Sequence, residues 1–408
     1  MFAAIPTMRR VLLLAAGSQA HGFVDAAARL GIELVSPPEH ITGSDDKAIA
    51  DLVAFGRANA VDGLVGSGDR ASLTAAHVAK ALRLPWHPPL AAVASRNKLL
   101  TRERLRDSDL LVPWFFPTSA TAAPAALAGM VSYPCVVKPV THTGGAGVIR
   151  ADDAASFVEA FERVRAVLAA REARGEADEA NDGLLVEGFI EGWEFALEGV
   201  MHHGALNAFA LFDKPDLLEG PIFDETIWVT PSLAPEPMQW DILDAVSRAA
   251  AALGLQHGPV HAEVRVADRG VYVLSVAAKP MEALWSPTLR FQKKGEGPAV
   301  ALEEVLLRHA LGESPSDWRR EAAASGVMMI PVPAPGVFRA VEGVAEATAI
   351  PGIDAVQILV SVDQPVVPRP DASAQLGVIF AHGATTEEVE GALREAHALL
   401  RFVIDPSA

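Results

Sequence analysis

The sequence predicts an α/β protein that begins with a wound parallel sheet and ends in a region of short strands. Short apolar strands alternate with amphipathic helices over residues 9–90, which is typical of a parallel sheet with helices on its faces. Half of the 408 residues are hydrophobic, which is enough for several buried cores. From about Gly326 onward, short strands and turns replace the earlier alternation.

Composition excludes several classes of partner. The net charge is −17, from 34 basic and 51 acidic residues that are spread along the chain. Such an acidic surface repels phosphate backbones, so we expect neither a nucleic-acid nor a membrane partner. No run of about 20 apolar residues is present that could span a bilayer. Cys135 is the one cysteine and cannot form an internal disulfide, which favours a cytoplasmic location.

Hydrophobic periodicity defines the elements of residues 1–90, which we expect to form one domain. A turn at Gly66–Asp69 follows the third strand, and a single glycine turn there is interpreted as a plain connector. The proline-rich segment Pro85–Leu90 marks the domain boundary. The expected strands are Val11–Leu14, Ile32–Val35 and Gly63–Val65, and the expected helices are Gly22–Gly31, Asp46–Ala58 and Ala71–Leu82.

The remaining elements are predicted in the same way. The turn Ala267–Gly270 predicts that the strands on either side of it form a hairpin. The expected helices are Asn97–Asp107, Ala154–Arg174, Trp240–Leu253, Leu302–Leu311 and Thr386–Leu400. The expected strands are Tyr133–Pro139, Leu184–Glu187, Trp193–Met201, Ala205–Asp213, Gly258–Val266, Val271–Ala277, Val327–Val332, Gly336–Val341, Ala355–Val362 and Gly377–Ala381.

A lysine at the end of a buried strand is the first candidate for chemistry. Burying the Lys138 ammonium is costly unless it meets an anion. The glycine-rich loop that follows lets backbone N–H groups point at a phosphate, although it lacks the Gly-Lys-Ser/Thr of a P-loop. A solvated loop with an exposed lysine is an equally good interpretation of this segment alone.

Two groups of carboxylates are the next candidates. Glu194 and Glu198 lie on one face of a strand, because their separation is an even number of residues. Glu263 and Lys279 lie on paired strands and could hold Mg²⁺ and a phosphoryl group. In isolation, a solvated strand edge and a cross-strand ion pair are the simpler alternatives.

In their order along the chain, these motifs resemble the ATP-grasp superfamily. The similarity is greatest to carboxylate–amine ligases of the L-amino-acid ligase type. It rests on Asn97-Lys98, Val136–Pro139, the glycine loop, Leu185–Glu194 and His261–Arg265. The C-terminal stretches 328–333 and 377–381 resemble the β-rich domain of those ligases. The resemblance implies a two-lobed ATP-grasp domain over 91–310, with lobes of about 91–190 and 191–310, followed by a β-rich domain over 311–408.

The resemblance also implies a reaction, cofactors and roles for particular residues. ATP, with one or two Mg²⁺ ions, would drive amide formation between a carboxylate and an amine, expected to be amino acids, through an acylphosphate. ADP and phosphate would be released, and a homodimer is expected. The nucleotide would be held by Lys98 and Lys138, by the loop residues Thr143, Gly144, Gly145 and Gly147, by the adenine hinge Glu187, Gly188, Phe189 and Ile190, and by Glu194. Glu263 would ligate Mg²⁺, and Arg265 and Lys279 would act in catalysis.

The second metal strand departs from the family pattern. Ser275 stands where a metal-ligating glutamate is expected, and Lys279 stands where an arginine is expected. One carboxylate ligand and the planar guanidinium are therefore missing, and Glu282 is a candidate replacement ligand. Two main hypotheses follow: a ligase with an altered metal site, which we favour, or a degenerate relative that binds nucleotide or a small molecule without turnover. A third, weaker one is another ATP-using reaction, such as phosphorylation or formation of an acylphosphate that is passed to a partner. For the substrates, Trp285 and Arg290 are candidates, with packing and a surface ion pair as their alternatives.

Overall fold

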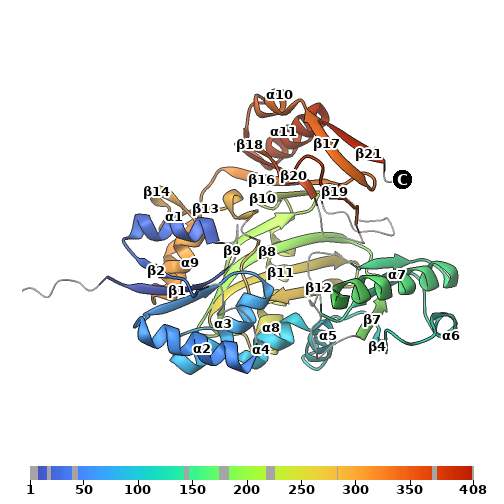
Figure 1. Ribbon diagram of the computed structural model, residues 1–408, viewed down its shortest axis with the longest axis horizontal. Coiled ribbons are helices and arrows are strands. Elements are labelled where there is room, and N and C mark those ends of the chain that lie inside the picture. Colours follow the sequence, from blue (N-terminus) through green and yellow to red (C-terminus); the bar gives the residue numbers. More distant parts are fainter. Residues whose placement is uncertain are drawn as a thin grey trace, which may run out of the picture.

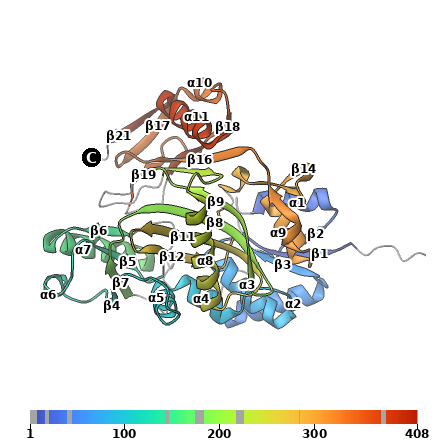
Figure 2. The same cartoon turned by 180° about the vertical axis from the view of Figure 1, so that it is seen from behind.

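In a computed structural model of the chain, three groups of elements surround a large central sheet. The structure describes residues 8–15, 20–38, 45–141, 147–173, 183–216, 226–282, 284–369 and 375–406. Figure 1 shows the N-terminal elements, in blue, on one side of the central sheet and the elements of residues 115–188, in green, on the other. The C-terminal elements, in orange and red, lie above, and Figure 2 shows the same arrangement from behind.

The N-terminal elements form the wound parallel sheet that the sequence predicts. Its strand order is β2-β1-β3, with both pairings parallel. An Asp45 carboxylate oxygen accepts the Ala48 N–H at the N-terminus of helix α2, which fixes where that helix begins. The strands are β1 (Arg10–Leu14), β2 (Glu33–Val35) and β3 (Gly63–Gly66), and the helices are α1 (His21–Leu30), α2 (Asp46–Ala58) and α3 (Asp69–Leu82).

The proline-rich segment after α3 differs from the expectation of a plain boundary. Pro89 occupies the first turn of a helix, α4 (Pro89–Arg96), and α5 (Lys98–Arg106) follows almost directly. Trp86 and His87 are buried. Proline lacks an N–H, but the N–H groups of a first helical turn have no partner within the helix, so these prolines begin a helix.

A four-stranded antiparallel sheet, here the small sheet, is covered on one face by α7 (Ala154–Ala173). Its order is β4-β7-β5-β6, and α6 (Pro124–Ala128) lies beside α7. Alternation along the strands sends Cys135, Val137 and Val186 into the core under α7. The same alternation turns Lys138 and Glu187 to the opposite face. The strands are β4 (Phe115–Ser119), β5 (Cys135–Pro139), β6 (Ile149–Ala151) and β7 (Gly183–Gly188).

An eight-stranded sheet, here the large sheet, forms the centre of the molecule in the order β12-β11-β8-β9-β10-β16-β20-β18. The predicted hairpin of β11 and β12 is present. Strand β16 pairs with β10, far from it in sequence, with Trp228 opposite Val327. Strands of the C-terminal region therefore continue the same sheet. The strands are β8 (Trp193–His202), β9 (Ala205–Asp213), β10 (Ile227–Thr230), β11 (Gly258–Ala267), β12 (Gly270–Ala277), β16 (Ala324–Pro331), β18 (Ile353–Ile358) and β20 (Gln375–Gly383).

Helices and two minor sheets complete the structure. The N-terminal sheet shares a core with the large sheet, in which Leu12 and Leu64 cluster with Leu197 and Val260. No helix in the described part of the chain has the length and apolar character needed to cross a membrane. The remaining elements are α8 (Glu236–Leu253), α9 (Leu302–Ala310), α10 (Val344–Thr348), α11 (Thr386–Leu399), the sheet of β13 (Arg290–Lys293), β14 (Glu296–Ala301) and β15 (Trp318–Arg320), and the sheet of β17 (Gly336–Glu342), β19 (Pro365–Val366) and β21 (Arg401–Pro406).

Candidate active site

A cavity lies between the small sheet, the large sheet and the first turn of α3. It gathers most of the residues that the sequence motifs pointed to, although they come from separate elements. Those that line it are Lys98, Lys138, Glu187, Gly188, Phe189, Ile190, Glu194, Glu263, Arg265, Ser275, Lys279 and Trp285. Their meeting in one place depends on the strand alternation and on the pairing of β8, β11 and β12 described above.

A buried ion-pair network joins α5 to both sheets at one wall of the cavity. The Lys138 ammonium contacts Glu187 Oε1, and Arg102 donates from Nε and Nη2 to the two oxygens of the same carboxylate at 2.8 and 3.2 Å. Arg102 Nη1 also donates to the carbonyls of Val273 and Leu274 on β12, at 3.1 and 3.0 Å. Arg102 is fully buried. The arginine therefore links α5, the small sheet and the large sheet.

The charge states of this wall are set by burial and by neighbouring charges. Burial, and next the Lys138 ammonium, lower the pKa of Lys98 to about 7. Burial likewise lowers the pKa of Lys138 to about 8, against the raising effect of Glu187. Burial alone would raise the pKa of Glu187, but Arg102 and Lys138 outweigh it and bring the pKa to about 2. The two lysines thus form a cationic site whose charge depends on pH near neutrality.

The segment after β7 provides a backbone edge beside apolar side chains. Gly188 and Phe189 donate their N–H groups to the carbonyls of Trp114 and Pro134, and the Ile190 carbonyl accepts from Arg265 Nη1 at 2.8 Å. Two guanidinium groups lie near the Phe189 ring, that of Arg150 at 4.2 Å and that of Arg265 at 5.1 Å from the ring centroid. Val136, Val148 and Leu274 form the apolar walls of this part of the cavity.

A second buried network occupies the large-sheet side. Lys214, just after β9, donates to Glu194 Oε1 at 2.7 Å and to Glu263 Oε1 at 2.9 Å, and its ammonium lies 4.6 Å from the Trp228 ring centroid. Arg265 donates to the other oxygen of Glu194 at 2.8 Å. Burial would raise the pKa of Glu263, but the Lys214 ammonium outweighs it and lowers the pKa to about 2. Glu263 is therefore a carboxylate throughout the neutral range.

The altered strand β12 lies directly opposite Glu263. Ser275 pairs with Glu263 in the β11–β12 ladder, and its hydroxyl donates to Glu263 Oε2 at 3.3 Å. Lys279 contacts Asp69 Oδ1 at 3.2 Å, at the start of α3. Burial lowers the pKa of Lys279, but the opposing effect of the carboxylates, with Asp69 and Glu282 foremost, is larger. The pKa of Lys279 therefore lies above its usual value. Lys279 therefore stays cationic near neutral pH, like the arginine it replaces.

Some predicted residues are not brought to the cavity by the structure. Arg290 is exposed on β13 and donates to the Ala299 carbonyl at 3.2 Å, outside the cavity lining. Thr143, Gly144 and Gly145 lie outside the described residues. Gly147 is described, with a φ of 72° that favours glycine, and a side chain there would come within 3.2 Å of Pro139.

Four residues of the site were missed by sequence reasoning. Arg102 and Lys214 link the carboxylates described above, but each partner is distant in sequence and no local pattern indicates it. Asp69 belongs to the glycine turn that was interpreted as a plain connector; its place after a parallel strand was the available signal. Arg369 reaches the cavity from the C-terminal region.

Comparisons with known proteins agree with this geometry. Residues 131–286 match the ATP-grasp domain family, and residues 328–405 match the L-amino acid ligase C-terminal domain 2. The crystal structure of L-amino acid ligase from Bacillus licheniformis superimposes with a TM-score of 0.79 at 25% identity, covering 97% of this chain and 99% of that one. The chain contains an ATP-grasp domain. The resemblance found in the motifs is thereby confirmed.

Two curated relatives extend the comparison. A formate-dependent phosphoribosylglycinamide formyltransferase from Thioalkalivibrio sulfidiphilus is 27% identical, over 98% of this ATP-grasp chain and 98% of its own length. Carnosine synthase 1 from Gallus gallus is 26% identical, over 75% of this chain and 35% of its own length. The similarity to the ligase structure and to the first of these relatives spans nearly the whole chain, so it includes the N-terminal parallel sheet.

Proposed function

We propose that this ATP-grasp protein is an ADP-forming ligase that joins a carboxylate to an amine through an acylphosphate, and that both substrates are amino acids. The observation that carries the proposal is the cavity in which Lys98, Lys138, Glu263 and the segment after β7 converge from both sheets. Two neighbouring lysines alone, or a carboxylate alone, could occur without residues from both sheets meeting in one cavity. The L-amino acid ligase structure that superimposes on nearly the whole chain supports the amino-acid substrates.

The ATP site follows from the chemistry of the lining. The adenine would lie between Val136, Val148 and Leu274 and pair with the backbone near Ile190, whose N–H has no hydrogen-bond partner among the described residues. The ammonium groups of Lys98 and Lys138 would neutralise phosphate oxygens. The network of Arg102 and Glu187 holds Lys138 in place, because the carboxylate fixes the position of the ammonium.

The residues present fit one Mg²⁺ site better than two. Glu263 supplies an ionised carboxylate, and Mg²⁺ is often bound in proteins by one or two carboxylates together with substrate phosphates. Lys214 engages Oε1 of Glu263, so Oε2, beside the Ser275 hydroxyl, is the oxygen that would bind the ion. When bound, Mg²⁺ would neutralise charge on the phosphoryl oxygens.

The reaction requires two displacements. An oxygen of the substrate carboxylate attacks the γ-phosphorus of ATP, the bond to the β-phosphate oxygen breaks, and ADP leaves. The amine nitrogen then attacks the acyl carbon, the bond to phosphate breaks, and the nitrogen loses a proton. Lys279 and Arg265 line the cavity and provide cationic stabilisation for the phosphoryl oxygens. Trp285, Met281 and Arg369 line the region left for the substrates. A cytoplasmic location and a homodimer stay predictions.

ADP release tests this proposal. Purified protein with ATP and Mg²⁺ is expected to release ADP when amino acids are supplied as a pool, and mass spectrometry should detect a dipeptide. Lys138→Ala should lower the affinity for ATP at least about tenfold, because a charge-assisted contact to phosphate is lost. Lys80→Ala, an exposed lysine on α3, is the control and should leave affinity unchanged. Tight ATP binding without ADP release under any amino-acid mixture would instead favour the binding-only hypothesis.

A further inference from the structure

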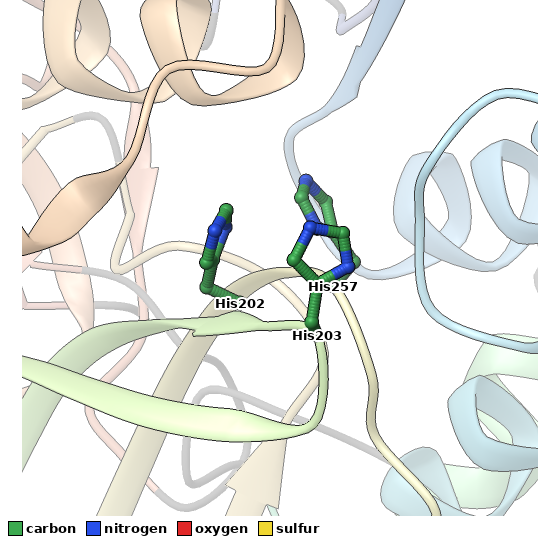
Figure 3. A group of neighbouring side chains, drawn as sticks. All are labelled: His202, His203 and His257. Carbon is green, nitrogen blue, oxygen red and sulfur yellow. The ribbon is translucent and has the colours of Figure 1, made fainter.

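Four of the twelve histidines gather at the end of the large sheet that is remote from Glu194. His202 ends β8, His203 lies in the β8–β9 turn, His257 immediately precedes β11, and His309 lies in α9. Figure 3 shows the side chains of His202, His203 and His257 projecting from neighbouring strand ends toward one another. One nitrogen from each of these three rings lies within 4.8 Å of the others.

Packing alone does not account for this cluster. His257 is 6% exposed, and both of its ring nitrogens are buried without a hydrogen-bond partner among the described residues. Leaving such a group unpaired is unfavourable, and a ligand at either nitrogen would offset the cost. Its ring also stacks on His309 at a centroid distance of 4.0 Å, with the ring planes 9° apart.

We propose that His202, His203 and His257 bind a divalent transition-metal ion of the Zn²⁺ type, at a structural site separate from the ATP cavity. Three imidazoles suit Zn²⁺, which is bound at about 2.0–2.1 Å, and they do not suit Mg²⁺, which prefers oxygen. Tetrahedral coordination at that bond length places ligand nitrogens about 3.4 Å apart, which is inside the 4.8 Å within which one nitrogen of each ring already lies. His309 holds the ring of His202 through a 3.1 Å contact between Nε2 and Nδ1, the orienting partner that ligating histidines usually have.

The surroundings give the ion a structural role. His202 lies eight residues from Glu194 along β8, or about 26 Å, so the site is remote from the phosphates. A small cavity beside His257 and His309 is also lined by Val65, Pro85 and Trp86 of the N-terminal region. An ion here would join the β8–β9 turn to the start of β11, next to α9 and the N-terminal region.

Metal titration of the full-length chain without a histidine tag tests the proposal. With excess Mg²⁺ present, calorimetry is expected to show one Zn²⁺ per chain, and Zn²⁺ should raise the melting temperature in a way that EDTA reverses. His257→Gln and, separately, His203→Gln should each lower Zn²⁺ affinity at least about tenfold. His203 is exposed, so its replacement does not disturb a core. His382→Gln, an exposed histidine on β20, is the control and should bind Zn²⁺ like the wild type.

Two results would overturn the proposal. One is a wild-type Zn²⁺ affinity no higher than that of His257→Gln and His203→Gln. The other is a lowered melting temperature in His257→Gln without any response of the wild type to Zn²⁺, which would show that the rings only pack. Because neither readout involves ATP turnover, the outcome is independent of the proposed ligase activity.

Discussion

Lys98 and Lys138 give the proposed nucleotide site a charge that varies within the physiological pH range. Lys138 is buried and Lys98 is half-buried, and the Lys138 ammonium contributes to the lowered pKa of Lys98. The pKa of Lys98 is about 7 and that of Lys138 about 8, so raising the pH removes positive charge from the site before ATP arrives. ATP binding should therefore favour the lower end of this range, where both ammonium groups exist.

We accordingly predict that kcat/KM for ATP falls as the pH rises from 7 to 9. This parameter reports the ionisation of the free enzyme, in which Lys98 loses its proton with a pKa of about 7. In Lys98→Arg the guanidinium stays charged, so this decline should flatten, and the remaining slope should come from Lys138. Steady-state kinetics on both proteins in the same buffers provides the measurement. Identical profiles would show that Lys98 does not bind phosphate.

At the scale of single elements, α5 is attached to both sheets through Arg102. Replacing this residue by methionine keeps the side-chain volume but leaves the Glu187 carboxylate with Lys138 alone and removes the donor from two β12 carbonyls. Breaking such a buried pair costs about 3–5 kcal/mol, and urea unfolding should show a loss of that size. Arg106→Met on the exposed face of α5 should change stability by less than about 1 kcal/mol. Equal losses in the two variants would contradict the assignment.

The β11–β12 ladder supplies a second prediction at this scale. Ser275→Glu would add a carboxylate directly opposite Glu263, which should lower the Mg²⁺ concentration needed for half-maximal activity several-fold. Ser275→Gln has the same length without the charge and should leave that concentration near the wild-type value. Activity measured across a Mg²⁺ series distinguishes the two. A similar shift in both variants would show that side-chain size, not charge, controls the site.

These elements also show what the sequence could predict. The hairpin of β11 and β12 was predicted because its turn and its alternation are local signals, but the pairing of Ser275 with Glu263 depends on a register shift between Glu263 and Val264 that these signals do not indicate. The placement of Lys138 and Glu187 on one face of the small sheet likewise follows from period-two alternation. The contacts of Arg102 and Lys214 were not predictable, because their partners lie 20 to 172 positions away. Helix α4 was missed because proline was taken only as a breaker.

At the scale of the whole molecule, the C-terminal region is built into the central sheet. A side chain at Gly326 of β16 would come within 2.8 Å of Val229 on β10 and 2.9 Å of Val389 on α11. Gly326→Ala should therefore force β10 and β16 apart and destabilise the protein by about 1–3 kcal/mol. Thermal unfolding should show one lowered transition. Gly391→Ala, on α11 with no atom within 4 Å of the added carbon, should be neutral or slightly stabilising. Two separate transitions would contradict a shared sheet.

The continuity of the large sheet also determines which parts of the molecule can be displaced without breaking strand pairing. Strands β8 to β12 and the C-terminal strands β16, β18 and β20 are hydrogen-bonded in one continuous sheet, so we treat them as one rigid unit. Among the described residues, no strand of the small sheet pairs with a strand of the large sheet, and side chains such as that of Arg102 link the two sheets. A displacement of the small sheet and α7 relative to the large sheet would therefore break no strand pairing among the described residues, only side-chain contacts such as those of Arg102.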